Sequence, residues 1–277
     1  MKKNKLLSSS LAYTIGNLLI QGLSFITLPI YTRVMTQEDY GNYNLYGSWV
    51  GIFSIFIGLQ ITGSFSIAKI KYENRFKEYI ATSTSVATIF FILFSTVCLI
   101  LSTYLEKILG FSTGILLFIL IQGYFSHLQG SLSQYYIQTQ ETKKQLILSF
   151  FMSFGNVVLS LLFLFTLKND FLARILGGVI PGIIVGIIFL IFIYKNSSVI
   201  LDKKYFRFIL ITSIPLVFHI LGHNLLSQLD RIMIGSYMTA KEVAIYSFGY
   251  SLGSIVLIAL MSMNTAWIPW FFEEKKK

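Results

Sequence analysis

Three arginines are the side chains best suited to bind a charged ligand in this 277-residue sequence. Arg33, Arg174 and Arg231 stand near the ends of long segments that are otherwise apolar. A guanidinium group binds a phosphate or a carboxylate through two parallel hydrogen bonds, a geometry that an ammonium group cannot reproduce. We expect these side chains either to bind phosphate or acidic sugar at a cavity mouth or to extend to a membrane interface.

Uncharged polar residues recur at helical spacing inside the apolar segments. The clearest series is Ser149, Ser153, Asn156 and Ser160, whose spacing places all four on one face of a helix. Polar groups are costly to leave in lipid, so they normally face another helix or water. The series therefore predicts either a cavity wall or hydrogen bonds between helices.

Two further polar faces lie 203 residues apart, because Gln21 corresponds to Asn224 and Ser24 to Ser227. Matched faces favour one shared central cavity over independent packing contacts. Asp230 forms either an ion pair with its neighbour or a site for a coupling proton or cation. The predicted cavity residues are Asn17, Gln21, Ser24, Arg33, Gln122, Ser153, Asn156, Arg174, His223, Asn224, Ser227, Gln228 and Arg231.

The sequence offers little for metal or covalent chemistry. His219 and His223 are spaced so that one helix could present both to a metal, but no Glu follows His219 in an H-E-x-x-H pattern and no third ligand is evident. Cys98 is the only cysteine, which excludes an internal disulfide. We assign no metal, no cofactor and no catalytic residue.

The elements that must position these side chains are long apolar helices. The chain is 55% hydrophobic and 12% charged with a mean hydropathy of +0.70, which is too apolar for a soluble protein. A helix of about 20 residues crosses the hydrocarbon core, whereas barrel strands alternate over about ten residues. Eight segments are at least about 20 residues long and contain no Asp, Glu, Lys or Arg. They are 6–32, 40–68, 79–105, 108–140, 145–167, 175–194, 208–229 and 243–272. The sequence predicts an all-α integral membrane protein with eight transmembrane helices.

The connections between these segments differ in positive charge. Numbered from the N-terminus, the odd connections hold 16 Lys and Arg residues and the even ones hold 6, while acidic residues divide equally. The positive-inside rule then places both chain ends in the cytoplasm. Although the net charge is +10, the basic residues are scattered singly at helix ends, which argues against nucleic acid as a partner.

One short motif occurs twice, as MTQEDYGNY at 35–43 and as MTAKEVAIY at 238–246. Each copy lies between two apolar segments, and duplicated halves are typical of transporters that hold a substrate between them. The spacing predicts a parallel repeat of six helices, hence a 6+6 two-bundle transporter that lacks its last four helices here. We expect a bundle over 1–194, a cytoplasmic linker over 195–207 and two helices of an incomplete second bundle over 208–277.

The segment LPIYTRVMTQEDYGNY at 28–43 resembles the end of helix one in bacterial polysaccharide-repeat-unit flippases, which belong to a superfamily with MATE drug exporters. DRIMIG at 230–235 and EVAIYS at 242–247 are similar to that family's exit from helix seven and entry to helix eight. The resemblance covers the whole chain in helix order. It implies two bundles of twelve or more helices in total and a cationic central cavity, but no basic residue lies deep inside a predicted span.

The resemblance also implies an activity and its partners. The cargo would be undecaprenyl-pyrophosphate-linked oligosaccharide, moved by alternating access from the inner to the outer leaflet of the bacterial plasma membrane. The product would serve capsule, O-antigen or exopolysaccharide synthesis, with membrane lipids and polysaccharide polymerase machinery as further partners.

Three alternatives remain open. A MATE-type antiporter of small molecules or cations would need acidic residues within the membrane, and every Asp and Glu lies at a predicted span boundary. A membrane polymerase or acyltransferase would need catalytic loops or a buried His and Arg constellation, whereas the loops here are short. A nonfunctional truncated product is the third. We expect a transporter rather than an enzyme.

Overall fold

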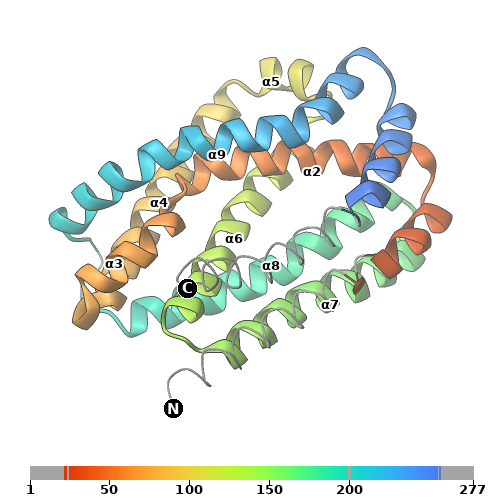
Figure 1. Ribbon diagram of the computed structural model, residues 1–277. Helices are drawn as coiled ribbons and strands as arrows, with labels where there is room; N and C mark the ends of the chain where they lie inside the picture. Colours follow the sequence, from red (N-terminus) through yellow and green to blue (C-terminus); the bar gives the residue numbers. More distant parts are fainter. Residues whose placement is uncertain (1–21, 24, 199–200, 255, 257–277) are drawn as a thin grey trace, which may run out of the picture.

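The computed structural model describes residues 22–23, 25–198, 201–254 and 256, which form a bundle of long helices (Figure 1). The elements are α2 (Gln37–Gly58), η1 (Ile61–Ser64), α3 (Phe65–Lys71), η2 (Glu73–Arg75), α4 (Phe76–Ile100), α5 (Ser102–Leu109), α6 (Thr113–Gln138), α7 (Thr142–Thr166), α8 (Asp170–Lys195) and α9 (Lys203–Tyr237). Residues 25–34 before α2 and 240–254 after α9 are also helical. These described residues contain no strand, so the all-α prediction is confirmed for them.

The chain is a multi-pass membrane protein. Among the described residues, five helices are long and apolar enough to cross a membrane, namely the spans that include α4, α6, α7, α8 and α9. The bent pair of α2 with the following η1 and α3 gives a sixth candidate. Much of the predicted spans 6–32 and 243–272 lies outside the described residues, so eight spans and the incomplete 6+6 repeat stay predictions.

The second predicted span, over 40–68, is a bent pair of helices in the structure. Leu59 and Gln60 have left-handed backbone conformations, with φ of 46° and 50°, and the helical pair bends by 54° at this point. A non-glycine residue in this region ends the hydrogen-bonding pattern of a right-handed helix. The third span is also divided, because α4 ends before the short α5 begins.

The duplicated motif starts a helix in both copies. Thr36 caps α2: its hydroxyl accepts from the Asp39 amide at 3.1 Å and donates to the Asp39 carboxylate at 2.8 Å. In the second copy, the Thr239 amide and hydroxyl both donate to the Glu242 carboxylate, which lowers the pKa of that carboxyl. The threonine and acidic positions that match between the copies are therefore helix-start signals.

The two copies of the motif contact each other, as the blue helix at 240–254 beside the start of α2 shows in Figure 1. Gln37 Nε2 donates to the Lys241 carbonyl at 3.3 Å. A Cβ atom added to Gly41 would lie 1.7 Å from the Ala240 carbonyl oxygen, so the two backbones meet at this glycine. Ala244, which corresponds to Gly41 in the repeat, packs in the same cluster as Tyr40.

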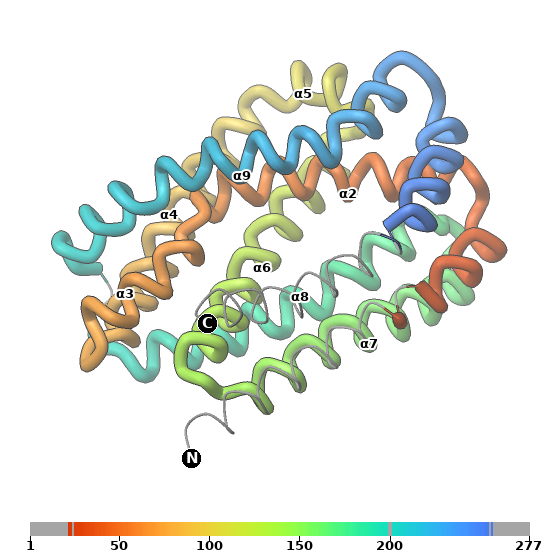
Figure 2. The backbone as a smooth tube through the Cα atoms, viewed as in Figure 1, coloured from red at the N-terminus to blue at the C-terminus, as the bar shows by residue number. Residues whose placement is uncertain are grey.

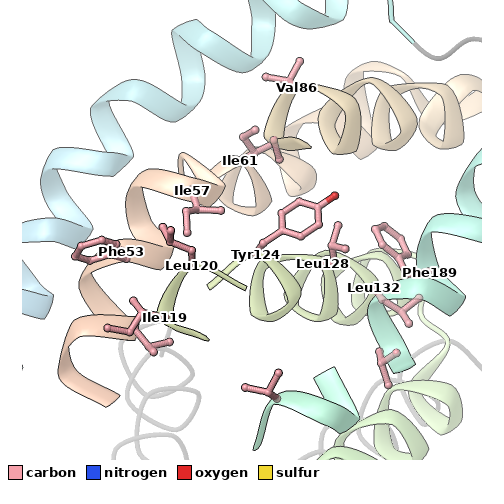
Figure 3. Close-up of a cluster of buried hydrophobic side chains, with 14 of the residues drawn as sticks. Phe53, Ile57, Ile61, Val86, Ile119, Leu120, Tyr124, Leu128, Leu132 and Phe189 are labelled. Carbon is pink, nitrogen blue, oxygen red and sulfur yellow. The ribbon is translucent and has the colours of Figure 1, made fainter. Parts of the chain in front are cut away.

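The largest hydrophobic core surrounds α6, which lies among α2, α4 and α8 (Figure 3). Helix α2 contributes Phe53 and Ile57, and α6 contributes Leu120, Tyr124 and Leu128. Leu120 and Leu128 are fully buried or nearly so, at 1% and 0% exposure. This core fixes the positions of the helix ends from which the polar residues project.

Helices α7 and α8 run side by side (Figure 2) and approach most closely at Gly177. A Cβ atom there would lie 2.6 Å from Ser160 Cα. Gly178, Gly182 and Gly186 share one face of α8, where small residues can allow close packing. Gly186 does so against the Phe125 ring, at 2.4 Å from Cδ1, but the nearest atom to a Cβ at Gly182 is 3.8 Å away.

Gly177→Ala is expected to lower the thermal unfolding midpoint, because the new methyl group must displace the α7 backbone at a cost of about 1–3 kcal/mol. Gly182→Ala is the matched control on the same helix, since its methyl group would make ordinary van der Waals contact. Unfolding of the purified protein in detergent, followed by tryptophan fluorescence, measures both. Equal midpoints for the two variants would contradict this account of the α7–α8 contact.

Candidate functional site

A cavity of about 390 Å³ lies between residues 23–31, the start of α2, the middle of α7 and the start of α8. Its polar lining comes from Thr27, Tyr31, Tyr40, Tyr43, Asn44, Ser153, Asn156 and Arg174. Leucine, methionine and valine side chains complete the wall. The lining therefore combines one cation, several hydrogen-bonding groups and three aromatic rings.

Arg174 is held between two tyrosine rings at the cavity. Its Cζ lies 4.1 Å from the Tyr31 ring centroid and 4.6 Å from that of Tyr43, a favourable cation–π geometry. Its Nη1 donates to Asn156 Oδ1 at 2.7 Å and to Ser160 Oγ at 2.6 Å. Since a guanidinium group has five N–H donors, those on Nη2 and Nε have no hydrogen-bond partner among the described residues. They are available to an anionic or hydroxyl-bearing ligand.

Two amide side chains, Asn156 of α7 and Gln122 of α6, lie beside Gly178 of α8. A Cβ atom at Gly178 would lie 3.2 Å from Asn156 Nδ2 and 3.5 Å from Gln122 Nε2. Gln122 Oε1 accepts from the Tyr46 hydroxyl at 2.6 Å. Gly178 therefore makes room for two amide side chains, one from α7 and one from α6.

A second arginine cluster joins α9 to its neighbours. Arg231 Nη1 donates to Gln228 Oε1 at 2.7 Å, and its Nε donates to Ser247 Oγ at 3.2 Å. The Cζ lies 4.6 Å from the Tyr250 ring centroid. Gln228 Oε1 also accepts from Ser48 Oγ of α2 at 3.0 Å. Arg231 was expected at a helix end but lies inside α9, which continues to Tyr237.

Asp230 does not pair with Arg231. Its Oδ2 accepts from the Tyr246 hydroxyl at 2.6 Å, and the only ion pair among the residues that the structure describes joins Lys144 to Glu141. Adjacent residues of a helix point in different directions, which separates the two charges. The ion-pair interpretation was wrong, and the role of Asp230 in ion coupling stays a prediction.

The other predicted cavity residues are more dispersed. Arg33 and His223 are exposed, and Arg33 has no hydrogen-bond or ion-pair partner among the described residues. Asn224 and Ser227 hydrogen-bond to backbone carbonyls of α9 itself. The remaining three predictions lie outside the described residues: Asn17, Gln21 and Ser24.

The structure thus brings Ser153, Asn156 and Arg174 together at one cavity, and Gln228 and Arg231 in a second cluster. Whether any of them contacts a substrate stays a prediction.

The sequence reasoning missed the aromatic part of the cavity. Tyr31, Tyr40 and Tyr43 were quoted only as motif residues, and Asn44 was not singled out. A usable signal was present, because Tyr40 and Tyr43 belong to the first copy of the duplicated motif. Around the second arginine, Ser48 and Tyr250 were missed in the same way.

Comparison with known proteins gives a family and a fold. The sequence model of a family described as polysaccharide biosynthesis protein matches residues 6–274. A protein of the Lsg locus of Haemophilus influenzae is 25% identical over 286 residues, covering 99% of this chain and 67% of that protein. A membrane protein of the same organism, named as uncharacterized, is 24% identical over 286 residues and covers 98% and 66%.

A solved structure named protein A has a TM-score of 0.71 at 15% identity, and the match covers 93% of this chain and 62% of that one. At this identity the likeness shows the fold alone. The chain spans about two thirds of the length of each of these proteins. The family match does not favour the MATE-type alternative.

Proposed function

The chain belongs to the polysaccharide biosynthesis protein family, and on this premise we propose that it acts in a flippase for lipid-linked oligosaccharide. The flippase moves undecaprenyl-pyrophosphate-linked repeat units from the inner to the outer leaflet of a bacterial plasma membrane. The units then enter capsule, O-antigen or exopolysaccharide synthesis. The observation that carries the proposal is the cavity around Arg174, whose lining is chemically suited to sugar and phosphate.

The cavity lining supports this cargo group by group. Asn44, Ser153 and Asn156 can exchange hydrogen bonds with sugar hydroxyls, and the tyrosine rings offer flat apolar faces to the C–H groups of a sugar ring. The Nη2 and Nε donors of Arg174, which have no hydrogen-bond partner among the described residues, suit a pyrophosphate or an acidic sugar. The volume of about 390 Å³ falls within the usual range for small-ligand pockets.

No covalent step is required for this activity. A sugar headgroup that enters the hydrocarbon core without partners loses its hydrogen bonds to water, at a cost of several kcal/mol for each polar group. A cavity lined with hydroxyl and amide groups replaces those bonds during the crossing. The protein lowers the barrier by providing a polar environment inside the membrane.

Alternating access is supported by the contact between the two motif copies. The distribution of Lys and Arg supports a cytoplasmic N-terminus and an outer location for both copies. The Gly41–Ala240 contact then closes the outer end of the path above the cavity. In this proposal, one bundle covers 1–194, residues 195–207 are the linker, and the second bundle begins at 208. A two-fold axis between the two bundles would bring equivalent segments into contact.

The proposal also includes a coupling site and a partner that receives the cargo. We propose Asp230 as the coupling site because its carboxylate accepts a hydrogen bond from the Tyr246 hydroxyl of the next helix. The polysaccharide polymerase machinery receives the cargo at the outer leaflet.

Reconstitution into liposomes with a fluorescent lipid-linked oligosaccharide tests the proposed function. Protein-containing vesicles are expected to move labelled headgroups between leaflets, so that an external membrane-impermeant quencher reaches more label than in empty vesicles. A fluorescent cation serves as the control cargo and is expected not to accumulate. Proton-driven cation uptake without oligosaccharide movement would replace the proposal with an antiporter.

A further inference from the structure

A second cavity, of about 300 Å³, lies at the end of the bundle opposite the duplicated motif. It is formed where η2 leads into α4, beside the ends of α6 and α8. Its cationic lining side chains are Lys69, Arg75 and Lys77, and the amides of Asn74 and Asn196 add hydrogen-bonding groups. Nothing in the proposed translocation uses this cavity.

The cations of this cavity are not neutralised by carboxylates at contact distance. The only ion pair among the described residues lies elsewhere, so none of the three has a carboxylate oxygen within 4.0 Å in that part of the chain. Lys69 Nζ lies 5.3 Å from the centroid of the Phe76 ring, and Lys77 Nζ lies 5.8 Å from that of Phe192. Phe76 stacks on Tyr135 with centroids 6.0 Å apart. Each of these two ammonium groups therefore lies beside an aromatic ring, with no carboxylate oxygen of the described residues within 4.0 Å.

The acidic side chains of the cavity set the charge of its ligand. Glu73 and Glu78 also line it, and Glu78 accepts from Ser198 Oγ at 3.3 Å. The lining has three cationic and two acidic side chains, which leaves one excess positive charge. A phosphodiester carries a single negative charge and matches this balance better than a multiply charged phosphate does.

The surface beside the cavity is apolar. Ile67 and Ile70 are 55% and 85% exposed on α3, the short helix that also carries Lys69. This combination fits a lipid, because the exposed isoleucines can contact its acyl chains while the neighbouring cations bind its headgroup. Basic pockets between transmembrane helices bind phospholipid headgroups by the same combination.

We propose that this cavity binds the phosphodiester headgroup of an anionic phospholipid, with Lys69, Arg75 and Lys77 as its cationic ligands. The acyl chains lie along α3. The proposal is independent of the cargo of the Arg174 cavity, and binding can be measured without any transport.

Binding of phosphatidylglycerol to the purified protein in detergent, followed by native mass spectrometry, tests the proposal. The triple variant Lys69→Gln, Arg75→Gln and Lys77→Gln is expected to bind this lipid at least about tenfold more weakly, because its cationic ligands are gone. Arg75 and Lys77 are exposed, so their replacement leaves the hydrophobic core unchanged. Each single variant, expected to show a smaller loss, covers the case in which the triple variant does not fold.

The matched control is Lys143→Gln, Lys195→Gln and Lys203→Gln, which removes the same charge from exposed positions at the same end of the bundle but outside the cavity. Its affinity for phosphatidylglycerol is expected to stay within about twofold of the original. If both triple variants lost affinity for phosphatidylglycerol equally, the proposal would be overturned, because the lipid would then respond only to the total positive charge of this surface. If inorganic phosphate displaced phosphatidylglycerol as effectively as unlabelled phosphatidylglycerol does, the assignment to a lipid would be overturned. If phosphatidylcholine bound as tightly as phosphatidylglycerol, the proposed match of charge would be overturned.

Discussion

Gly41→Ala is expected to reduce transport at least about tenfold and to lower the free energy of unfolding by about 3 kcal/mol. The added methyl carbon would stand 1.7 Å from the Ala240 carbonyl oxygen, a distance that no pair of unbonded atoms tolerates. The two motif copies must therefore separate, and the hydrogen bond from Gln37 to Lys241 breaks with them. Headgroup translocation in liposomes and the thermal midpoint in detergent measure the two effects.

Gly47→Ala is the control for this prediction. Gly47 lies on the same helix as Gly41, and an added Cβ atom would meet nothing within 4 Å. Alanine also favours helix over glycine by about 1 kcal/mol, so this variant is expected to keep its stability and its transport. If Gly41→Ala behaved like Gly47→Ala, the contact between the copies would have no part in closing the outer end.

Arg174→Ala is expected to have the second large effect. Ser160 is fully buried at 0% exposure and Asn156 lines the cavity, so both lose a charged hydrogen-bond partner. A hydrogen bond to a charged group contributes about 1.5–3 kcal/mol. We expect the thermal midpoint to fall by several degrees and binding of a pyrophosphate-containing glycolipid to weaken by about tenfold.

Two further substitutions sharpen this prediction. Arg174→Lys keeps the charge but cannot stack between Tyr31 and Tyr43 while donating to both partners, so it is expected to restore little. Arg33→Ala removes an exposed arginine without partners among the described residues and is expected to change stability by less than about 0.5 kcal/mol. Similar losses of binding from Arg33→Ala and Arg174→Ala would show that only the total charge matters.

The helices that cross the membrane could be predicted because one physical cost dominates there. An ionised side chain in hydrocarbon is so unfavourable that a charge-free segment of sufficient length has few other uses. Helices α6, α7 and α8 accordingly appear at the segments 108–140, 145–167 and 175–194. The same reasoning gave no information on backbone breaks, because Leu59 and Gln60 are not residues that typically end helices.

The end of α9 was misjudged for a related reason. Asp230 and Arg231 end a charge-free segment, but a helix continues beyond the hydrocarbon core wherever its charges find partners. Hydrogen bonds to Tyr246 and Gln228 meet that condition. Gln228 belongs to α9 itself, but Tyr246 comes from the next helix, and charge patterns along the sequence do not describe such a contact.

The candidate site could be predicted in part. The helical period placed Ser153 and Asn156 on one face, and both line the cavity. The tyrosines around Arg174 could not be assigned in this way, because tyrosine is counted with the hydrophobic residues in the composition. Their meeting with Arg174 depends on the packing of segments more than 100 residues apart in sequence.

The break at Leu59 has a consequence for how the protein is seated in its membrane. Helix α2 has 22 residues. At 1.5 Å per residue it is about 33 Å long, close to the roughly 30 Å of the hydrocarbon core. We therefore expect the 54° bend to fall near the boundary between lipid tails and headgroups, with α3 beyond it. We expect α3 to lie in that boundary and to set the depth of the bundle, because it combines the exposed Ile67 and Ile70 with the basic Lys69 and Lys71.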